Sequence, residues 1–218
     1  MIDIKTDSRK VKKGDTFIAI KHNERDGHDY IDEAIKRGAS RIICEKGSYP
    51  VQTILVKDTN KFLNFYLKNK YYKEIENMKF IGVTGTNGKT TTCFLVHQML
   101  DLLGMKNAYI GTIGFYLDKE QRQLKNTTPD IYELYNLLLE AKEAKARAVV
   151  MECSSQALDE DRLHDIEFDE VAFTNLTQDH LDYHKNIDNY INSKEKLFKK
   201  TRNNKIAIIN KEDRKSVV

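Results

Sequence analysis

A glycine-rich loop between an apolar run and a helical pattern constrains the fold of this chain more than any other feature. Residues 79–84 read Lys-Phe-Ile-Gly-Val-Thr, which is typical of a buried strand, and a helix is predicted over residues 89–103. Between them lies Gly-Thr-Asn-Gly-Lys-Thr-Thr. A strand, a tight loop and a helix N-terminus together aim backbone N–H groups and the helix dipole at an anion. The segment therefore predicts an α/β domain that binds phosphate.

The loop assigns a role to each of its residues. Two glycines let the backbone curl around a phosphate, Lys89 is placed to reach the terminal phosphates, and Thr90 is placed to hold Mg²⁺. The predicted nucleotide-binding residues are Gly85, Thr86, Asn87, Gly88, Lys89, Thr90 and Thr91. The common G-x-x-x-x-G-K-[ST] pattern requires glycine at position 83, where this chain has Val83, so the loop is a variant. A turn without a ligand is the alternative, but it gives the Lys-Thr pair no packing role.

A GTPase is a second interpretation of the same loop. Residues 210–213, Asn-Lys-Glu-Asp, match the guanine-reading N-K-x-D pattern, and residues 101–104, Asp-Leu-Leu-Gly, match D-x-x-G. Both patterns are short. The second falls within the predicted helix rather than at the end of a strand, so it is not placed to approach a γ-phosphate, and ATP is the favoured nucleotide.

Short apolar runs alternate with helical patterns along the rest of the chain. Strands are predicted over residues 16–20, 41–44 and 53–56, with a helix over residues 30–37, and a stretch rich in lysine and tyrosine over residues 68–79 marks a boundary. We therefore expect a small N-terminal α/β domain over residues 1–77 and a P-loop domain with a mostly parallel sheet over residues 78–218. In the second domain, strands are expected over residues 148–151, 170–173 and 205–209.

Two further helices are predicted in the second domain. Thr128 and Pro129 have the residue types of an N-cap and a first helical residue, and the apolar residues Ile131, Leu134 and Leu138 then recur at helical spacing. Residues 190–199 show the same periodicity.

Composition excludes several classes of protein. The 36 basic and 33 acidic residues leave a formal charge of +3, a mixed surface that does not favour nucleic acid as a partner. The three cysteines, Cys44, Cys93 and Cys153, form no C-x-x-C pair, which argues against a disulfide scaffold or a zinc knuckle. No apolar run approaches the roughly 18 residues of a membrane span. We expect a cytoplasmic, monomeric protein without membrane insertion.

Residues 83–91 resemble the ATP loop of the Mur ligase family, and further segments resemble that family in the same order. They are residues 126–129 (Asn-Thr-Thr-Pro), 151–158 (Met-Glu-Cys-Ser-Ser-Gln-Ala-Leu), 173–176 (Phe-Thr-Asn-Leu) and 179–184 (Asp-His-Leu-Asp-Tyr-His). Residues 6–15 and 26–31 look like the family's uridine-nucleotide-binding domain. The resemblance covers essentially the whole chain and is closest to the members that add the third peptide residue to UDP-N-acetylmuramoyl-L-alanyl-D-glutamate.

The resemblance implies an ATP-dependent ligase of peptidoglycan synthesis that works through an acyl phosphate. Its substrates would be UDP-N-acetylmuramoyl-dipeptide and a diamino acid, meso-diaminopimelate or L-lysine, with ATP and Mg²⁺ as cofactors. The implied catalytic residues are Lys89, Glu152, His180 and Lys194, and the implied metal-holding residues are Thr90, Glu152, His180 and Lys194. Lys194 matches a lysine that is carbamylated by CO₂. The implied muramyl-dipeptide contacts are Asn126, Thr127, Thr128, Ser154 and Arg162, and the implied uridine contact is Ser8.

The residues also have plainer interpretations. Glu152 follows an apolar run, and a carboxylate at the carboxyl end of a parallel strand is well placed for a site, although a surface acid is the alternative. Lys194 lies in a lysine-rich helix, so its spacing alone predicts a solvated side chain. Arg162 follows an acidic run, where a surface ion pair is as good an interpretation as substrate binding.

The sequence departs from the family pattern in three places. His22 replaces a usual glycine, Glu160 replaces a usual neutral contact, and family members continue beyond the position of Val218 into a domain that selects the incoming amino acid. We therefore expect the chain to hold the nucleotide and muramyl half-sites. A binding module without turnover and a different P-loop enzyme, such as a folylpolyglutamate synthetase-like ligase, remain the alternatives.

Overall fold

The computed structural model describes residues 2–22, 25–179 and 181–213. The chain divides into two compact units, Met1–Tyr72 and Lys73–Val218, each built on its own sheet. Among the described residues, no helix has both the length and the apolar character that crossing a membrane requires.

The first unit is a small parallel sheet with a helical cover. Its strands β1 (Ile4–Lys5), β2 (Thr16–Ile18), β5 (Arg41–Cys44) and β6 (Gln52–Leu55) lie in the order β1-β2-β5-β6, and each neighbouring pair is parallel. A short antiparallel pair, β3 (Lys21–His22) and β4 (Arg25–Asp26), leads into the 3-10 helix η2 (Gly27–Tyr30) and then α1 (Ile31–Lys36). A further 3-10 helix, η1 (Ser8–Lys10), follows β1.

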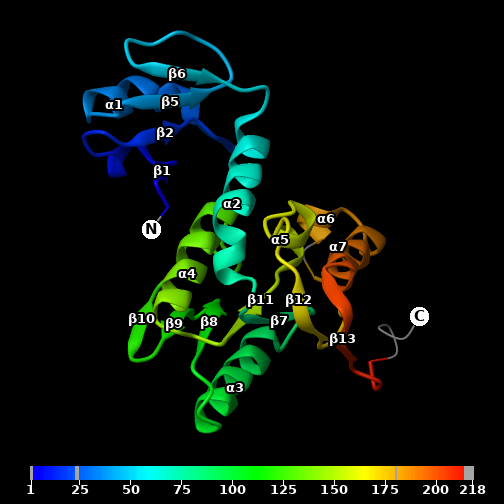
Figure 1. Cartoon of the computed structure of the whole chain (residues 1–218). Coiled ribbons are helices and arrows are strands. Elements are labelled where there is room, and N and C mark those ends of the chain that lie inside the picture. The colour runs from blue at the N-terminus through cyan, green and yellow to red at the C-terminus, as the bar shows by residue number, and fades with distance from the viewer. Residues whose placement is uncertain (1, 23–24, 180, 214–218) are drawn as a thin grey trace. The chain divides into compact units, whose positions relative to one another are not determined.

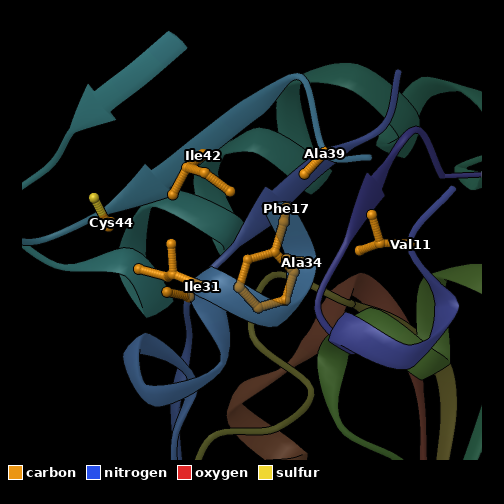
Figure 2. Packing of buried hydrophobic residues seen from close by; sticks show 8 residues of the cluster. Val11, Phe17, Ile31, Ala34, Ala39, Ile42 and Cys44 are labelled. Carbon is orange, nitrogen blue, oxygen red and sulfur yellow. The ribbon is translucent and has the colours of Figure 1, made fainter. Parts of the chain in front are cut away.

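The core of the first unit lies between α1 and the sheet. Figure 2 shows Phe17 of β2 beside Ile31 and Ala34 of α1, with Ile42 of β5 in the same cluster. These side chains are at most 1% exposed. The predicted α/β unit is therefore confirmed, and β2, β5, β6 and α1 lie within two residues of the predicted ranges. The short strands β1, β3 and β4 were not predicted.

One long helix was not predicted. α2 (Thr59–Ile75) includes most of the stretch that we expected to be a boundary, and the division between the two units falls inside it, after Tyr72. Its buried residues recur every four positions, at Thr59, Leu63, Leu67, Tyr71 and Ile75. Because a threonine and a tyrosine belong to this stripe and lysines surround it, the composition resembled a polar linker.

The second unit contains a seven-stranded sheet (Figure 1). The strand order is β10-β9-β8-β11-β7-β12-β13, and the five strands from β8 to β13 in this order are parallel. The parallel strands are β7 (Lys79–Thr84), β8 (Asn107–Gly111), β11 (Ala148–Glu152), β12 (Phe168–Phe173) and β13 (Thr201–Ile209). β9 (Gly114–Leu117) and β10 (Glu120–Arg122) extend one edge in antiparallel pairing. The mostly parallel sheet is confirmed.

Helices cover both faces of this sheet. Ile81 and Val83 of β7 pack in one cluster with Cys93 and Phe94 of α3 (Lys89–Leu102). Gly82 points to the other face, towards Leu197 of α7 (Ile187–Lys199). The remaining helices are α4 (Ile131–Glu143), α5 (Ser155–Asp159) and α6 (Leu181–His184).

The predicted start of α4 was wrong by two residues. The helix begins at Ile131, and its N-cap is Asp130, whose side chain accepts a hydrogen bond from the N–H of Glu133. The hydroxyl of Thr128 instead donates to the backbone oxygen of Glu152, 2.8 Å away and 24 residues later in the sequence. Because Thr128 bonds this distant partner, it does not cap the helix. The local sequence pattern does not reveal such a partner.

Candidate active site

The carboxyl ends of the parallel strands carry the predicted site. β7 lies between β11 and β12 in the sheet. From β7 the chain crosses past β11 to reach β8, whereas from β11 it crosses past β7 to reach β12, so the connections that leave these two neighbouring strands run in opposite directions. In open α/β sheets, ligands bind at such a switch point, outside the carboxyl ends of the strands. The glycine-rich loop follows β7 at this position, and Glu152 is the last residue of β11.

The loop is held against the segment that follows β12. Thr86 N–H donates to the Asn175 carbonyl (2.9 Å), Asn87 N–H donates to the Asn175 side chain (3.0 Å), and the Thr174 hydroxyl donates to the Asn87 carbonyl (2.6 Å). Gly85 has φ +142°, and a Cβ on it would lie 1.9 Å from the Thr174 oxygen. A side chain at position 85 is therefore excluded.

These contacts determine which backbone N–H groups of the loop remain available to bind an anion. Those of Thr86 and Asn87 are used within the protein. The N–H groups in the first turn of an α-helix have no intrahelical acceptor, and α3 begins at Lys89 directly after Gly88. The first turn of α3, with its positive dipole end, is therefore the anion-facing part of the loop.

Two lysine side chains, Lys89 half-buried and Lys194 buried, lie at the base of the loop. The Lys89 ammonium donates to the carbonyls of Gly85 and Thr86, each at 2.9 Å, and the Lys194 amine donates to the same Gly85 carbonyl at 2.8 Å. Burial lowers the pKa of Lys89. Burial first, and the charge of Lys89 second, lower the pKa of Lys194 to about 7. The prediction of a solvated Lys194 from spacing is wrong, because its side chain is only 1% exposed.

The Glu152 carboxylate is fully buried and accepts four hydrogen bonds. Its Oε1 accepts from the Tyr109 hydroxyl (2.5 Å) and from the Thr112 N–H (2.8 Å). Its Oε2 accepts from the hydroxyls of Thr90 (2.9 Å) and Thr112 (3.1 Å). Burial and the bond to Glu152 raise the pKa of Tyr109, so this phenol stays protonated and donates. The interpretation of Glu152 as an incidental surface acid is wrong.

A polar cavity of about 350 Å³ joins these groups. It is lined by residues 86–90, Thr112, Thr127, Glu152, Ser154, Ser155, Gln156 and Lys194. The structure thus brings together most of the predicted loop residues, two of the predicted muramyl contacts and three of the predicted catalytic residues, Lys89, Glu152 and Lys194. Thr112 and Tyr109 were missed by the sequence reasoning. Thr112 follows an apolar run that ends in glycine, the strand-end pattern that singled out Glu152, so it had a usable signal.

The other predicted residues lie outside this lining. Asn126 and Thr91 are exposed, and Thr128 is buried beneath the cavity, where it accepts from the Ser154 N–H. The Arg162 guanidinium pairs with Glu160 (2.6 Å) and also donates to the Thr128 carbonyl (3.2 Å). It therefore combines the predicted ion pair with a contact towards the predicted substrate residues.

Three other predictions lie elsewhere. Ser8 belongs to the first unit, where its buried hydroxyl donates to Glu33 (2.8 Å). His180 lies outside the described residues, as does the side chain of His22. Of the residues in the GTPase patterns, Asp101 lies inside α3 as expected, and Asn210 donates to the Thr174 carbonyl, so it helps to hold the loop after β12.

The donor set fits one magnesium ion shared with phosphates. Among the described residues, no three His, Cys, Asp or Glu side chains cluster as a metal site, and Glu152 is the one acid lining the cavity. Mg²⁺ is usually bound by one or two carboxylates together with phosphate and water oxygens. The Glu152 carboxylate and the Thr90 hydroxyl, hydrogen-bonded to each other at 2.9 Å, are the oxygen groups that would hold such an ion.

Comparison with known proteins agrees with the fold and the loop. Residues 83–217 match the Mur ligase middle domain, and residues 3–82 match the Mur ligase family, catalytic domain. The chain is 40% identical over 214 residues to UDP-N-acetylmuramoyl-L-alanyl-D-glutamate–2,6-diaminopimelate ligase of Clostridium perfringens, covering 97% of this chain and 44% of that protein. It is 44% identical over 211 residues to the Aquifex aeolicus protein of the same name, covering 96% of this chain and 44% of that protein.

Solved structures give the same result. A UDP-N-acetylmuramoyl-L-alanyl-D-glutamate–2,6-diaminopimelate ligase matches with a TM-score of 0.75 at 27% identity, over 98% of this chain and 44% of that one. MurF ligase from Thermotoga maritima in complex with ADP matches with a TM-score of 0.68 at 25% identity, over 94% of this chain and 45% of that one. The chain therefore spans less than half the length of these relatives.

The switch-point sheet, the glycine-rich loop and the polar cavity define an α/β protein of the P-loop class. The match to the Mur ligase middle domain covers residues 83–217, which is more than half of the chain, and it identifies the family within this class. The chain belongs to the Mur ligase family.

Proposed function

We propose that this chain forms the uridine-nucleotide-binding domain, residues 1–77, and the first part of the ATP-binding domain, residues 78–218, of a ligase that extends a muramyl peptide. The reaction would join meso-diaminopimelate or L-lysine to UDP-N-acetylmuramoyl-L-alanyl-D-glutamate, at the cost of ATP. The observation that carries this proposal is that the first turn of α3, Lys89, Glu152 and Lys194 line one polar cavity. The names of the relatives at 40% and 44% identity support the choice of substrate.

ATP is the proposed nucleotide. The first turn of α3 and the Lys89 ammonium would bind its phosphates, because both line the cavity and present positive charge. The ADP complex of the Thermotoga maritima relative, at 25% identity, supports a nucleotide at this position.

Thr90, Glu152, His180 and Lys194 are the proposed holders of Mg²⁺. A bound Mg²⁺ would neutralise phosphate charge during phosphoryl transfer. Since the pKa of Lys194 is about 7, a large share of its side chain is a neutral amine at physiological pH, and a neutral amine is the form that reacts with CO₂. This supports the proposed carbamylation of Lys194.

The proposed reaction has two steps. A substrate carboxylate oxygen attacks the γ-phosphorus of ATP, so that ADP leaves and an acyl phosphate forms. The incoming amine then attacks the acyl carbon, a tetrahedral intermediate collapses, inorganic phosphate leaves, and the amine loses a proton to give the amide. Each step gathers negative charge, which fixed cations such as Lys89 stabilise.

Muramyl-dipeptide contacts are proposed in the same cavity. Thr127 and Ser154 line the cavity, and Arg162 lies next to them through its bond to Thr128. Asn126 and the Ser8 uridine contact complete the proposed set. Cytoplasmic location, the monomeric state and the absence of nucleic-acid partners stay predictions from the sequence.

A phosphate-release assay tests the proposal. The chain is incubated with ATP, Mg²⁺, UDP-muramyl-dipeptide and either lysine or meso-diaminopimelate, and each substrate is omitted in turn. Phosphate release that needs both the dipeptide and one diamino acid is the expected result. Binding of both ligands without release would show instead a binding module.

A further inference from the structure

The phenol of Tyr109 is the one buried hydroxyl of β8 that points at the candidate site. Tyr109 pairs with Val150 of β11 in parallel register, so its side chain reaches forward to Glu152, two residues further along. The ring is fully buried, and the hydroxyl lies 2.5 Å from Glu152 Oε1. The proposed reaction and the proposed ligand contacts assign no role to Tyr109.

The two oxygens of Glu152 have different kinds of donors. Oε1 accepts from a buried phenol and from the Thr112 backbone N–H, and a backbone N–H is a donor only. Oε2 accepts from the hydroxyls of Thr90 and Thr112, and each hydroxyl can rotate to present a lone pair instead. Only the Oε2 side can therefore exchange its hydrogen bonds for a cation without depriving the Thr112 N–H, which can only donate, of its acceptor.

Gly111 fits closely around the same contact. A Cβ on Gly111 would lie 2.2 Å from the Tyr109 hydroxyl oxygen and 2.3 Å from Glu152 Oε1. Both atoms therefore occupy the space where every other residue type has its side chain. The Tyr109 hydroxyl and the Glu152 carboxylate therefore have no room to move towards β8, and this contact fixes the plane of the carboxylate on that side.

Neighbouring rings fix the phenol itself. The Tyr109 ring packs edge-on against Phe94 (centroids 5.8 Å apart, 88°) and against Tyr116 (5.6 Å, 83°). Such edge-on pairs restrict the orientation of each ring. The hydroxyl is thus presented to Glu152 by a rigid group rather than by a flexible side chain.

We propose that Tyr109 is a positioning residue for Glu152: its hydroxyl, packed against Gly111, holds Oε1 so that Oε2 alone faces the cation and phosphates in the cavity. The inference rests on the proposed Mg²⁺-nucleotide site. It assigns Tyr109 no contact with substrate, and its effect passes entirely through the orientation of the carboxylate.

The test compares Tyr109→Phe with Tyr116→Phe by calorimetric titration of ADP, with and without Mg²⁺. Phenylalanine keeps the ring contacts and removes only the oxygen. Tyr116 is a matched control, since it belongs to the same ring cluster and its hydroxyl has no hydrogen bond within the described part of the chain. The readout is the ratio of ADP affinities with and without Mg²⁺, which a general loss of stability does not change.

We expect Tyr109→Phe to lower this ratio about 10-fold or more, as partners of metal ligands do, while the affinity without Mg²⁺ and the ratio for Tyr116→Phe stay at the wild-type values. Gly111→Ala, which crowds the same two oxygens, is a second variant and should lower the ratio in the same way. An unchanged ratio in Tyr109→Phe, or an equal fall in Tyr116→Phe, overturns the inference. A wild-type protein without any Mg²⁺ effect overturns the proposed metal site, and the inference with it.

Discussion

Replacing Lys194 by methionine should change how stability depends on pH. Burial and the neighbouring Lys89 lower the pKa of Lys194 to about 7, whereas an unfolded lysine keeps a pKa near 10.4. Between these values the unfolded state binds more protons than the folded state, so the lysine makes the folded state more stable as pH rises. Methionine has a similar length and no titration. The Gly85 carbonyl keeps a donor in the variant, because Lys89 also bonds it.

The magnitude follows from the pKa difference. Each pKa unit corresponds to about 1.4 kcal/mol, so between pH 7 and pH 9 the lysine should raise the free energy of unfolding by about 2 kcal/mol. Other groups titrate in the same range; burial raises the pKa of Cys93 and Cys153, which acts in the opposite direction. The difference between wild type and Lys194→Met removes these contributions.

The assay is urea unfolding at pH 7 and pH 9. Far-ultraviolet circular dichroism is the suitable signal because the chain has no tryptophan. The buffers are purged of CO₂, so that carbamylation does not contribute. Relative to Lys194→Met, the wild-type protein should gain about 2 kcal/mol between the two pH values. Equal gains in the two proteins would show that Lys194 is not a buried amine with a lowered pKa.

Three further predictions concern the site and the fold. Glu152→Gln should have a free energy of unfolding within about 2 kcal/mol of the wild-type value, since its amide oxygen can take the place of Oε1 and its NH₂ can donate to the rotating hydroxyls. In the same variant, calorimetry should find that Mg²⁺ no longer strengthens ADP binding. Leu67→Ala in α2 should lower the free energy of urea unfolding by 2–5 kcal/mol, whereas Phe65→Ala on the exposed side should change it by less than about 0.5 kcal/mol; equal effects would contradict the packing of α2. Thr128→Val should cost roughly 1–3 kcal/mol in the same assay, because the Ser154 N–H loses its acceptor, and Thr127→Val should cost less.

The sequence was most informative where local pattern and chemistry coincide. β7 has the predicted bounds, Lys79–Thr84, and α3 begins at the predicted Lys89, because an apolar run, two glycines and a lysine-threonine pair fix a strand, a turn and a helix start within a few residues. Glu152 was singled out as a carboxylate at the end of an apolar strand, and it is the last residue of β11.

The features that were missed depend on partners far along the chain. The Tyr109 hydroxyl bonds Glu152, 43 residues later, and no pattern around Tyr109 distinguishes this phenol from an ordinary buried ring. Thr128 has the residue type of a helix cap, but the Glu152 carbonyl takes its hydroxyl. The burial of Lys194 follows from the fold of α7 over β7, which the lysines of that helix conceal.

The most direct test of the proposed nucleotide site compares ADP binding in the presence of Mg²⁺ for two lysine variants of one strand-loop unit. Lys89→Ala removes the ammonium at the loop, and Lys79→Ala removes an exposed lysine at the opposite end of β7. Titration calorimetry should find binding in the wild type and in Lys79→Ala, and at least about a 10-fold loss in Lys89→Ala, the size expected for a lost charged contact. Equal affinity in all three proteins would contradict a phosphate-binding role for the loop.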